Sequence, residues 1–292
     1  MGKVLLMGGG GGVVGSGILA ELAGRYPIRS YHRTPTPLEQ GRVEFVSGNV
    51  LETSRFPSLV EGVDAIVNVV WYRQPGPDRL FARTSTALQA LVEAAVRSGV
   101  HRFVQISLPP ATPRLEAKTP YLYRKREFER VLLRSGLEVT LLQPSAIFAP
   151  KDRLVYVMLD LMRRYGRFPI FGEGGYHLTP VWNRDVGWLV GEALEGRLSG
   201  SVLVGGPERF TYLELLALLQ KHVPRPVRFV KVSPSVGRFA VRFFNAVGWH
   251  VLYTYEHDWL VSDLLGFPAP PHPGREFLTL ERFLSSPPGA TG

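Results

Sequence analysis

The chain has no cysteine among its 292 residues, which excludes disulfides, thiolate metal sites and cysteine nucleophiles. It also has no run of roughly 18 uninterrupted apolar residues, so the sequence predicts no transmembrane helix. No charged segment followed by a short apolar stretch opens the chain, so no secretory signal is expected either. These absences favour a cytoplasmic enzyme or binding protein.

Several catalytic motifs are missing as well. The seven histidines include no H-x-x-x-H or H-E-x-x-H spacing, so we expect no metal site. No G-x-S-x-G is present, which removes the usual signature of an α/β hydrolase. The early glycines are not followed by the lysine of a P-loop, which argues against an NTPase.

The charge is basic but spread along the chain. Lysine and arginine number 34 against 25 acidic residues, for a net charge of +9, and only "YRKREFER" at 123–130 is locally dense. A nucleic acid or an anionic membrane is one partner for such a chain, but a scattered basic surface suits a site for a phosphorylated cofactor better. We therefore predict a small-molecule substrate, no nucleic acid and no integral membrane segment, for a monomer or homodimer.

Short apolar runs alternate with helical patterns through the first half of the chain. The predicted strands are residues 3–7, 28–32, 43–49, 64–71, 101–107 and 138–144. Helical spacing separates several of them, most strongly at 84–99 and 121–136. Such alternation predicts an α/β fold, a doubly wound parallel sheet of the Rossmann type with helices on both faces.

The second half of the chain is organised differently. Helical patterns at 153–166, 211–223 and 235–252 surround a turn-rich stretch at 167–182. We predict a Rossmann domain at 1–150, with 181–205 returning to it, and a smaller, interleaved C-terminal substrate-binding region at 151–180 and 206–292. The last half-dozen residues are expected to be disordered.

Five consecutive glycines, at 8–12, follow the first predicted strand. Gly9, Gly12 and Gly15 fit the spacing G-x-x-G-x-x-G, and the other glycines of the run are surplus to it. In a dinucleotide-binding turn the first glycine permits the tight turn, the second lets the backbone approach the pyrophosphate, and the third lets helix and strand pack closely. A flexible linker is the alternative, but a linker requires neither the strand before it nor the helix after it.

The end of the second strand discriminates between cofactors. An acidic residue there would bind the ribose hydroxyls of NAD. This chain has "YHRTP" instead, so Arg33, helped by His32 and Thr34, is positioned for the 2′-phosphate of NADP. The sequence therefore favours NADP, with NAD as the alternative.

Longer motifs resemble one protein family. "GGGGGVVG" stands where that family has T-G-x-x-G-x-x-G, "VSGNV" puts Asn49 in place of an aspartate that meets adenine, and "EGVDAIVNV", "LVEAAVRSGVHRFVQIS" and "GEGGYHLTPVWNRDVGWLVGEAL" match later segments. The chain thus resembles the atypical or extended short-chain dehydrogenases/reductases, and especially NmrA-like and complex-I 39-kDa-subunit-like proteins. The resemblance also implies the remaining cofactor contacts, which are Val13, Val14, Val50, Val69, Val70, Lys125 and Pro144.

The resemblance implies a catalytic set as well. Tyr121 and Lys125 form a Y-x-x-x-K pair on one helix face, in which the tyrosine handles the proton and the lysine binds the nicotinamide ribose. The family's active hydroxyl falls on Leu108, so the triad is incomplete, with Ser107 one residue early and Thr112 a further candidate. Trp71, Tyr72 and Phe148 are expected to line the substrate cleft, and ordinary packing is the alternative for the aromatic pair.

Two classes of function remain open, and a third is less favoured by the sequence. The first is an NADP-dependent oxidoreductase acting on a carbonyl or quinone-like molecule, and the aromatic C-terminal region would suit an apolar one. The second is a non-catalytic NAD(P)-binding sensor or accessory protein. A nucleotide-sugar epimerase or dehydratase is the third. The apolar helix at 236–252, with basic residues beside it, is predicted to be a core helix, and a membrane-surface element is its alternative.

Overall fold

The computed structural model describes residues 2–37, 43–73, 78–150, 152 and 154–286. It divides into two compact units, which are described separately. The first holds residues 1–108, 112–143 and 183–202, and the second holds 109–111, 144–182 and 203–292. That the second unit binds the substrate stays a prediction.

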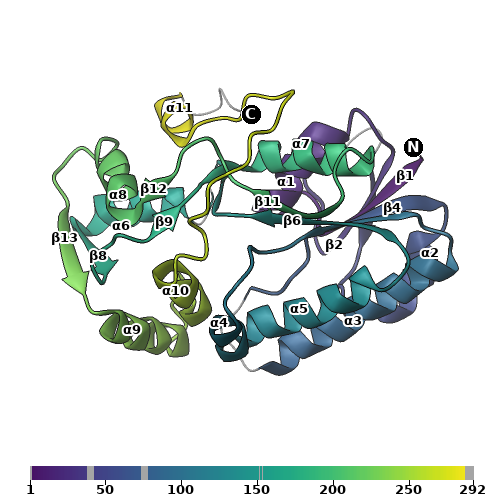
Figure 1. The fold of residues 1–292 in the computed structure, drawn as a ribbon, viewed down its shortest axis with the longest axis horizontal. Coiled ribbons are helices and arrows are strands. Elements are labelled where there is room, and N and C mark those ends of the chain that lie inside the picture. The colour runs from purple at the N-terminus through teal and green to yellow at the C-terminus, as the bar shows by residue number, and fades with distance from the viewer. Residues whose placement is uncertain (1, 38–42, 74–77, 151, 153, 287–292) are drawn as a thin grey trace. The chain divides into compact units, whose positions relative to one another are not determined.

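A seven-stranded sheet forms the centre of the first unit, in the order β11-β6-β5-β4-β1-β2-β3 (Figure 1). The strands are Lys3–Met7 (β1), Ile28–His32 (β2), Val43–Ser47 (β3), Val63–Asn68 (β4), Arg102–Ile106 (β5), Glu138–Pro144 (β6) and Gly200–Val204 (β11). Neighbouring strands from β3 to β6 are all parallel. The strand order reverses on either side of β1, so the predicted doubly wound Rossmann fold is confirmed.

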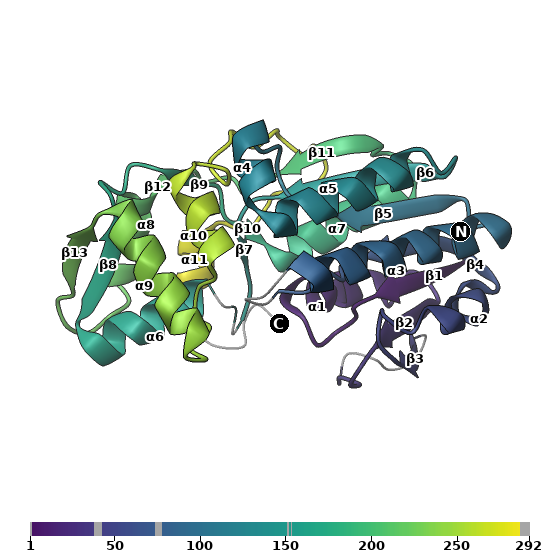
Figure 2. The ribbon, with the colours of Figure 1, turned by 90° about the horizontal axis from the view of Figure 1, so that it is seen from below.

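Helices cover both faces of this sheet (Figures 1 and 2). Val13–Leu22 (α1) and Asn183–Leu194 (α7) lie on one face, and Phe56–Val60 (α2), Asp78–Arg97 (α3) and Pro120–Leu133 (α5) lie on the other. The second group joins the strands in a core that includes Ile66, Leu91, Phe103 and Phe128. Burial of these apolar faces is what holds the crossover helices to the sheet.

The second unit packs around two helices, Val155–Tyr165 (α6) and Tyr212–Gln220 (α8). Three small sheets accompany them: Ile147–Phe148 (β7) with Val181–Trp182 (β10), Arg167–Phe171 (β8) with Arg228–Val232 (β13), and His177–Leu178 (β9) with Phe210–Thr211 (β12). Further helices are Pro234–Ala246 (α9), Thr254–Val261 (α10) and Leu280–Ser285 (α11), and Pro113–Lys118 (α4) belongs to the first unit.

Two expectations from the sequence need correction or limits. The helix predicted at 235–252 ends at Ala246, because Gly248 adopts φ +87° and turns the chain. The stretch 167–182, expected as turns, contains β8, β9 and β10. The expected disorder of the last half-dozen residues falls outside the described residues. Within the described part of the chain, no helix combines the length and the apolar character needed to traverse a bilayer.

Candidate functional site

The glycine run makes the turn from β1 into α1. Gly8 takes φ +93°, donates its N–H to the Tyr31 carbonyl at 3.0 Å, and lies where a Cβ would come within 2.8 Å of both Val69 and Val70. Among the described glycines of the run, Gly8 is the one with a positive φ, so it makes the tight turn that the motif assigned to Gly9. The turn thus packs closely against the residues that follow β4.

The other motif glycines sit where side chains would collide or where space is open. A Cβ on Gly9 would lie 2.0 Å from the Ser30 Oγ, and one on Gly15 would lie 2.1 Å from the Gly9 carbonyl oxygen. Gly15 thus lets the helix start rest directly on the loop, as predicted. Gly12 instead faces open space, since a Cβ there would have no neighbouring atom within 4 Å among the described residues.

No side chain of the described residues caps the N-terminus of α1. Gly12 is its N-cap, and the first turn contains no acidic residue. Val13 and Val14 begin the helix and are half-buried. Unpaired N–H groups and the helix dipole favour a phosphate at such an end. The local structure therefore fits the pyrophosphate of a dinucleotide.

Asn183 braces this helix start, which sequence reasoning missed. Its Nδ2 donates to the Val13 carbonyl at 2.9 Å and to the Ser16 Oγ at 3.2 Å. Gly17 lets α7 come close, because a Cβ there would lie 2.3 Å from the Asn183 carbonyl oxygen. The motif "NRDVGWLVGEAL" predicted a helix here, but the pattern alone did not predict that its asparagine contacts the glycine loop.

The residues predicted to discriminate between NADP and NAD lie at the end of β2. The His32 ring is half-buried and meets Phe45 edge-on, with ring centroids 5.1 Å apart. Arg33 and Thr34 are exposed, and in the described part of the chain the Arg33 guanidinium makes no ion pair. No carboxylate of the described residues therefore neutralises the cation at this strand end.

Asn49 and Tyr72 are brought together. The Tyr72 hydroxyl donates to the Asn49 Oδ1 at 2.7 Å, and the Asn49 backbone carbonyl accepts from the Tyr31 hydroxyl at 2.9 Å. Tyr72 therefore lies beside the residue predicted to meet adenine, whereas the sequence assigned it to the substrate cleft. Val50, predicted to contact the cofactor, has its side chain buried in the core of this unit.

Tyr121 lies in an aromatic cluster at the start of α5. Its ring meets Trp71 and Phe81 edge-on, with centroid separations of 6.0 and 5.4 Å. Arg124, one turn on, bonds both carboxylate oxygens of Asp78 and so ties α5 to the start of α3. The Trp71 Nε1–H is buried and finds no acceptor among the described residues. An acceptor atom of a ligand would satisfy it.

Lys125 is buried beneath the same tryptophan. Its Nζ lies 4.9 Å from the centroid of the Trp71 ring, and the residue is 3% exposed. Burial lowers the pKa of Lys125 to about 8, an effect that Glu129 opposes and Arg126 reinforces. A cation over an indole face is favourable, and hydroxyl acceptors would further favour its charged form.

Ser107, directly after β5, joins a buried network with two side chains of α5. Its Oγ donates to the Glu129 carboxylate at 2.5 Å and accepts from Arg126 at 3.0 Å, and Arg126 also pairs with Glu129 at 2.6 Å. A hydroxyl has one proton, and here it is given to Glu129. In this arrangement Ser107 does not donate to a substrate carbonyl. Thr112, the other candidate, caps α4 by accepting from the Leu115 N–H.

Two predicted site residues belong to the second unit. Pro144 is buried at the end of β6. Phe148 has no exposed surface, because it packs in the core of that unit with its ring centroid 5.1 Å from that of Phe283. Contact between Phe148 and a substrate stays a prediction. The buried position of the ring does not favour such a contact.

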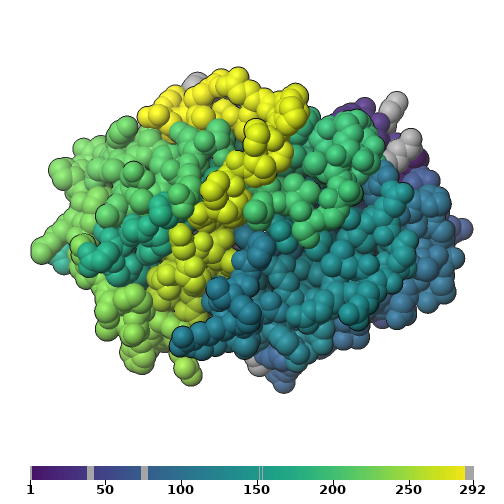
Figure 3. All heavy atoms as spheres, viewed as in Figure 1, coloured from purple at the N-terminus to yellow at the C-terminus, as the bar shows by residue number. Residues whose placement is uncertain are grey.

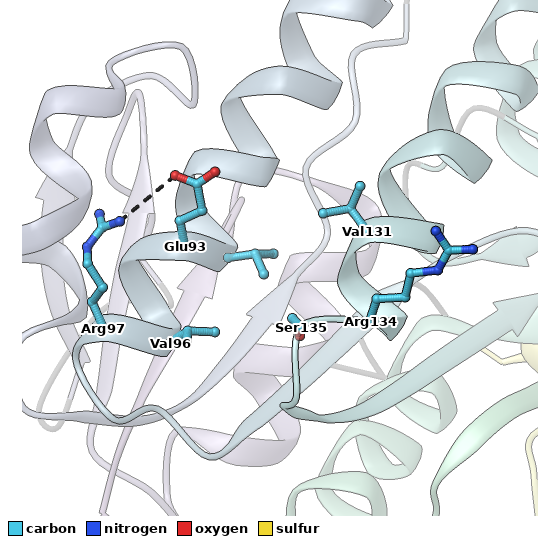
Figure 4. Close-up of a pocket in the computed structure, with 7 residues that line it drawn as sticks. Glu93, Val96, Arg97, Val131, Arg134 and Ser135 are labelled. Atoms are coloured by element: carbon cyan, nitrogen blue, oxygen red, sulfur yellow. Dashed lines mark ion pairs between the residues drawn. The ribbon is translucent and has the colours of Figure 1, made fainter.

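A shallow hollow of about 470 Å³ lies elsewhere on the first unit (Figure 4). It is formed at the C-terminal ends of α3 and α5 and is lined by Val92, Glu93, Val96, Arg97, Val131, Arg134 and Ser135. Arg134 is 13 residues after Tyr121, about 20 Å along a helix at 1.5 Å per residue. Ligands of parallel sheets bind at the opposite edge, so this hollow is separate from the candidate site.

No cluster of three or more histidine, aspartate or glutamate side chains suited to a metal ion occurs within residues 2–37, 43–73, 78–150, 152 and 154–286. The described residues assemble a glycine turn at an uncapped helix N-terminus, an arginine at a strand end, and the Tyr121–Lys125 face.

Known proteins are similar to this chain in sequence or in fold. A (4-alkanoyl-5-oxo-2,5-dihydrofuran-3-yl)methyl phosphate reductase of Streptomyces griseus is 28% identical over 247 residues, which are 82% of this chain and 80% of that protein. NADH dehydrogenase (ubiquinone) 1 alpha subcomplex subunit 9 of Arabidopsis thaliana mitochondria is 26% identical over 50% of this chain, but the match spans just 36% of that subunit. The solved structure of MoeE5 with UDP-glucose and NAD has a TM-score of 0.67 at 19% identity, covering 80% of this chain and 85% of MoeE5, and so shows the fold.

The family assignment follows from a sequence match over more than half of the chain. The NAD(P)H-binding family is matched by residues 9–162, which begin in the glycine turn and run through Tyr121 and Lys125. The protein therefore belongs to the NAD(P)H-binding family.

Proposed function

We propose that this protein is an NADP-dependent reductase of a small carbonyl or quinone-like molecule. The observation that carries the proposal is the α5 face, on which Tyr121 and the buried Lys125 share the Trp71 ring. A buried cation beside a phenol favours the phenolate, so it eases loss of the phenolic proton. The reductase of Streptomyces griseus, similar over 82% of this chain, supports the same class of reaction.

The proposed roles follow from the geometry of the first unit. When bound, the nicotinamide cofactor would supply a hydride. The open N-terminus of α1 at Gly12 would hold the pyrophosphate, and Lys125 would donate to the nicotinamide ribose. Tyr121 would give its proton to the substrate oxygen as that oxygen gains charge. The Trp71 indole N–H, which has no acceptor among the described residues, would bind a substrate or cofactor oxygen.

The preference for NADP rests on the end of β2. Arg33 is exposed, carries no ion pair within the described residues, and follows a strand end without an acidic residue. A free guanidinium binds a 2′-phosphate by charge-assisted hydrogen bonds. Arg33→Ala is expected to weaken NADPH binding at least about tenfold and to leave NADH binding unchanged. Arg134→Ala, in the hollow of Figure 4, is the matched control, and equal affinities of the wild type for NADPH and NADH would refute the preference.

Turnover distinguishes a reductase from a binding protein. The purified protein is assayed for NADPH oxidation against a panel of quinones, aldehydes and ketones. Tyr121→Phe is expected to abolish turnover while leaving the dissociation constant for NADPH unchanged. Tyr123→Phe is the control, because Tyr123 lies on the same helix but is exposed. Full turnover by Tyr121→Phe would overturn the assignment of the proton donor.

The second candidate is a non-catalytic NAD(P)-binding protein. Its support is Ser107, whose single proton is donated to Glu129, so that this hydroxyl is not free to polarise a substrate. Similarity over half of the chain to a respiratory-complex subunit agrees with it. This candidate predicts NADPH binding without turnover across the whole panel.

A further inference from the structure

Helix α9 carries an apolar face that nothing in the described chain covers. Six of the fourteen large apolar side chains that are exposed among the described residues fall between positions 236 and 249. We call them the α9 face: Val236, Phe239, Phe243, Phe244, Val247 and Trp249. Figures 1 and 3 show α9, in light green, at the surface of the second unit. Phe239 is 71% exposed, which is unusual for a phenylalanine that has no binding partner.

The opposite side of α9 is anchored, so its exposed side has a fixed orientation. Gly237 and Val241 are buried, and a Cβ on Gly237 would lie 2.3 Å from the Phe171 ring. The Arg238 guanidinium bonds the Asp258 carboxylate of α10 at 2.9 Å. Residues 236, 239, 243 and 247 recur at helical spacing and therefore form one stripe away from these anchors.

The end of the stripe is built as a compact aromatic turn. Gly248 adopts φ +87°, and the Trp249 N–H returns to the Phe244 carbonyl at 2.9 Å. The Trp249 ring then meets the Phe244 ring edge-on, with centroids 4.7 Å apart. Asn245 holds the turn through a 2.8 Å bond to the Leu252 carbonyl. The exposed tryptophan is thus fixed beside the phenylalanines instead of folding into the core.

The segment that carries this face is rich in basic residues, of which Lys221, Lys231 and Arg238 pair with Glu281, Glu173 and Asp258 of the same unit. Residues 215–255 contain six lysines and arginines and no aspartate or glutamate. Arg225, Arg228 and Arg242 have no carboxylate partner in the described part of the chain. Phenylalanine and tryptophan on one side of a helix with basic residues nearby are typical of helices that lie in a membrane interface. A protein partner would need a matching apolar groove, whereas an anionic bilayer satisfies both the apolar stripe and the positive charge.

We propose that the α9 face binds the surface of an anionic lipid bilayer. The aromatic side chains would lie among the upper acyl chains, and Arg242 would contact headgroup phosphates. Binding of this kind anchors the protein to a bilayer surface without a spanning segment. It does not depend on the proposed reductase activity.

Vesicle binding tests the proposal with the full chain. Sedimentation with phosphatidylcholine vesicles is compared with sedimentation with vesicles that contain about one third phosphatidylglycerol. We expect binding to the anionic vesicles, weakened by salt. The emission of Trp249, the one exposed tryptophan of the five, should shift to shorter wavelength, and Trp249→Phe should remove that shift.

Variants separate the apolar from the electrostatic contribution. The double variant Phe239→Ser/Phe243→Ser is expected to lower the vesicle partition coefficient about tenfold or more. Arg242→Glu should also lower it, whereas Tyr165→Ser, at an equally exposed aromatic residue of the same unit, should not. Unchanged melting temperature and NADPH affinity show that each variant is folded.

Three results would overturn the proposal. The first is that the wild type does not bind anionic vesicles. The second is that Phe239→Ser/Phe243→Ser binds them as tightly as the wild type. The third is a wild-type dimer that ignores vesicles and becomes monomeric in the double variant, which would assign the α9 face to a second copy of the chain.

Discussion

The buried ammonium of Lys125 makes the stability of this protein depend on pH in an unusual direction. Burial lowers the pKa of Lys125 from 10.5 to about 8. Below about pH 8 the folded state carries a charge that burial disfavours, and above about pH 10.5 neither state carries it. Between these limits the unfolded chain binds more protons, so this group makes the folded state more stable as the pH rises.

The size of the effect follows from the pKa difference. A lowering from 10.5 to about 8 corresponds to roughly 3 kcal/mol between the two protonation states. Most of this difference, roughly 2 kcal/mol, is expected as a rise in the free energy of unfolding between about pH 7 and about pH 10. Lys125→Met keeps the length of the side chain and its packing against Trp71 but removes the charge.

Urea denaturation of both proteins at the two pH values measures this difference. The free energy of unfolding of the wild type, relative to that of Lys125→Met, should rise by about 2 kcal/mol between about pH 7 and about pH 10. Lys118→Met, which removes an exposed lysine, should show no such change. If the two proteins kept a constant difference across this range, the ammonium would not be desolvated, and the account of how Lys125 assists Tyr121 would fail with it.

Four further substitutions test the glycine loop, the contact of Ser107 with Glu129, and the support that Asn183 gives to the start of α1. Gly15→Ala should lower the free energy of unfolding by about 1–3 kcal/mol, because its Cβ would meet the Gly9 carbonyl oxygen. Gly12→Ala should lower the free energy of unfolding by less than about 1 kcal/mol but should weaken NADPH binding. Calorimetry measures the free energy of unfolding of both variants. Ser107→Ala should lower the free energy of unfolding by about 1.5–3 kcal/mol in urea denaturation, because the Glu129 carboxylate loses a hydrogen-bond donor. A loss of turnover with unchanged stability would instead indicate that Ser107 has a catalytic role. Asn183→Ala should lower the melting temperature and weaken NADPH binding, and an effect on neither would show that the start of α1 needs no brace.

Local patterns were sufficient to predict the glycine turn and the strand and helix on either side of it. Glycine spacing between a strand and a helix predicts a phosphate-binding turn because only glycine fits the close approaches found at Gly9 and Gly15. Strand alternation predicted the parallel sheet, because apolar runs of that length must be buried on both faces. The i, i+4 spacing put Tyr121 and Lys125 on one face of α5 for the same kind of local reason.

Contacts between segments that are distant in the sequence could not be predicted from local patterns. Asn183 reaches the Val13 carbonyl across 170 residues, and the Tyr72 hydroxyl reaches Asn49 from another strand end. The sequence likewise assigned Ser107 to catalysis, because nothing in its motif says that Glu129, 22 residues later, accepts its proton. Such partners depend on how helices pack on the sheet, which residue spacing does not encode.

The sequence by itself determined the fold class, the glycine turn and the candidate proton-handling pair, because each follows from interactions within a few residues or from the period of one element. The tertiary structure alone decided which side chains are committed elsewhere and which are left exposed. It paired Ser107 with Glu129, buried Lys125 under Trp71, and left the α9 face bare where the sequence predicted a core helix. The physical reason is that burial and hydrogen-bond partners are properties of packed surfaces, and they appear when elements far apart in the chain come together.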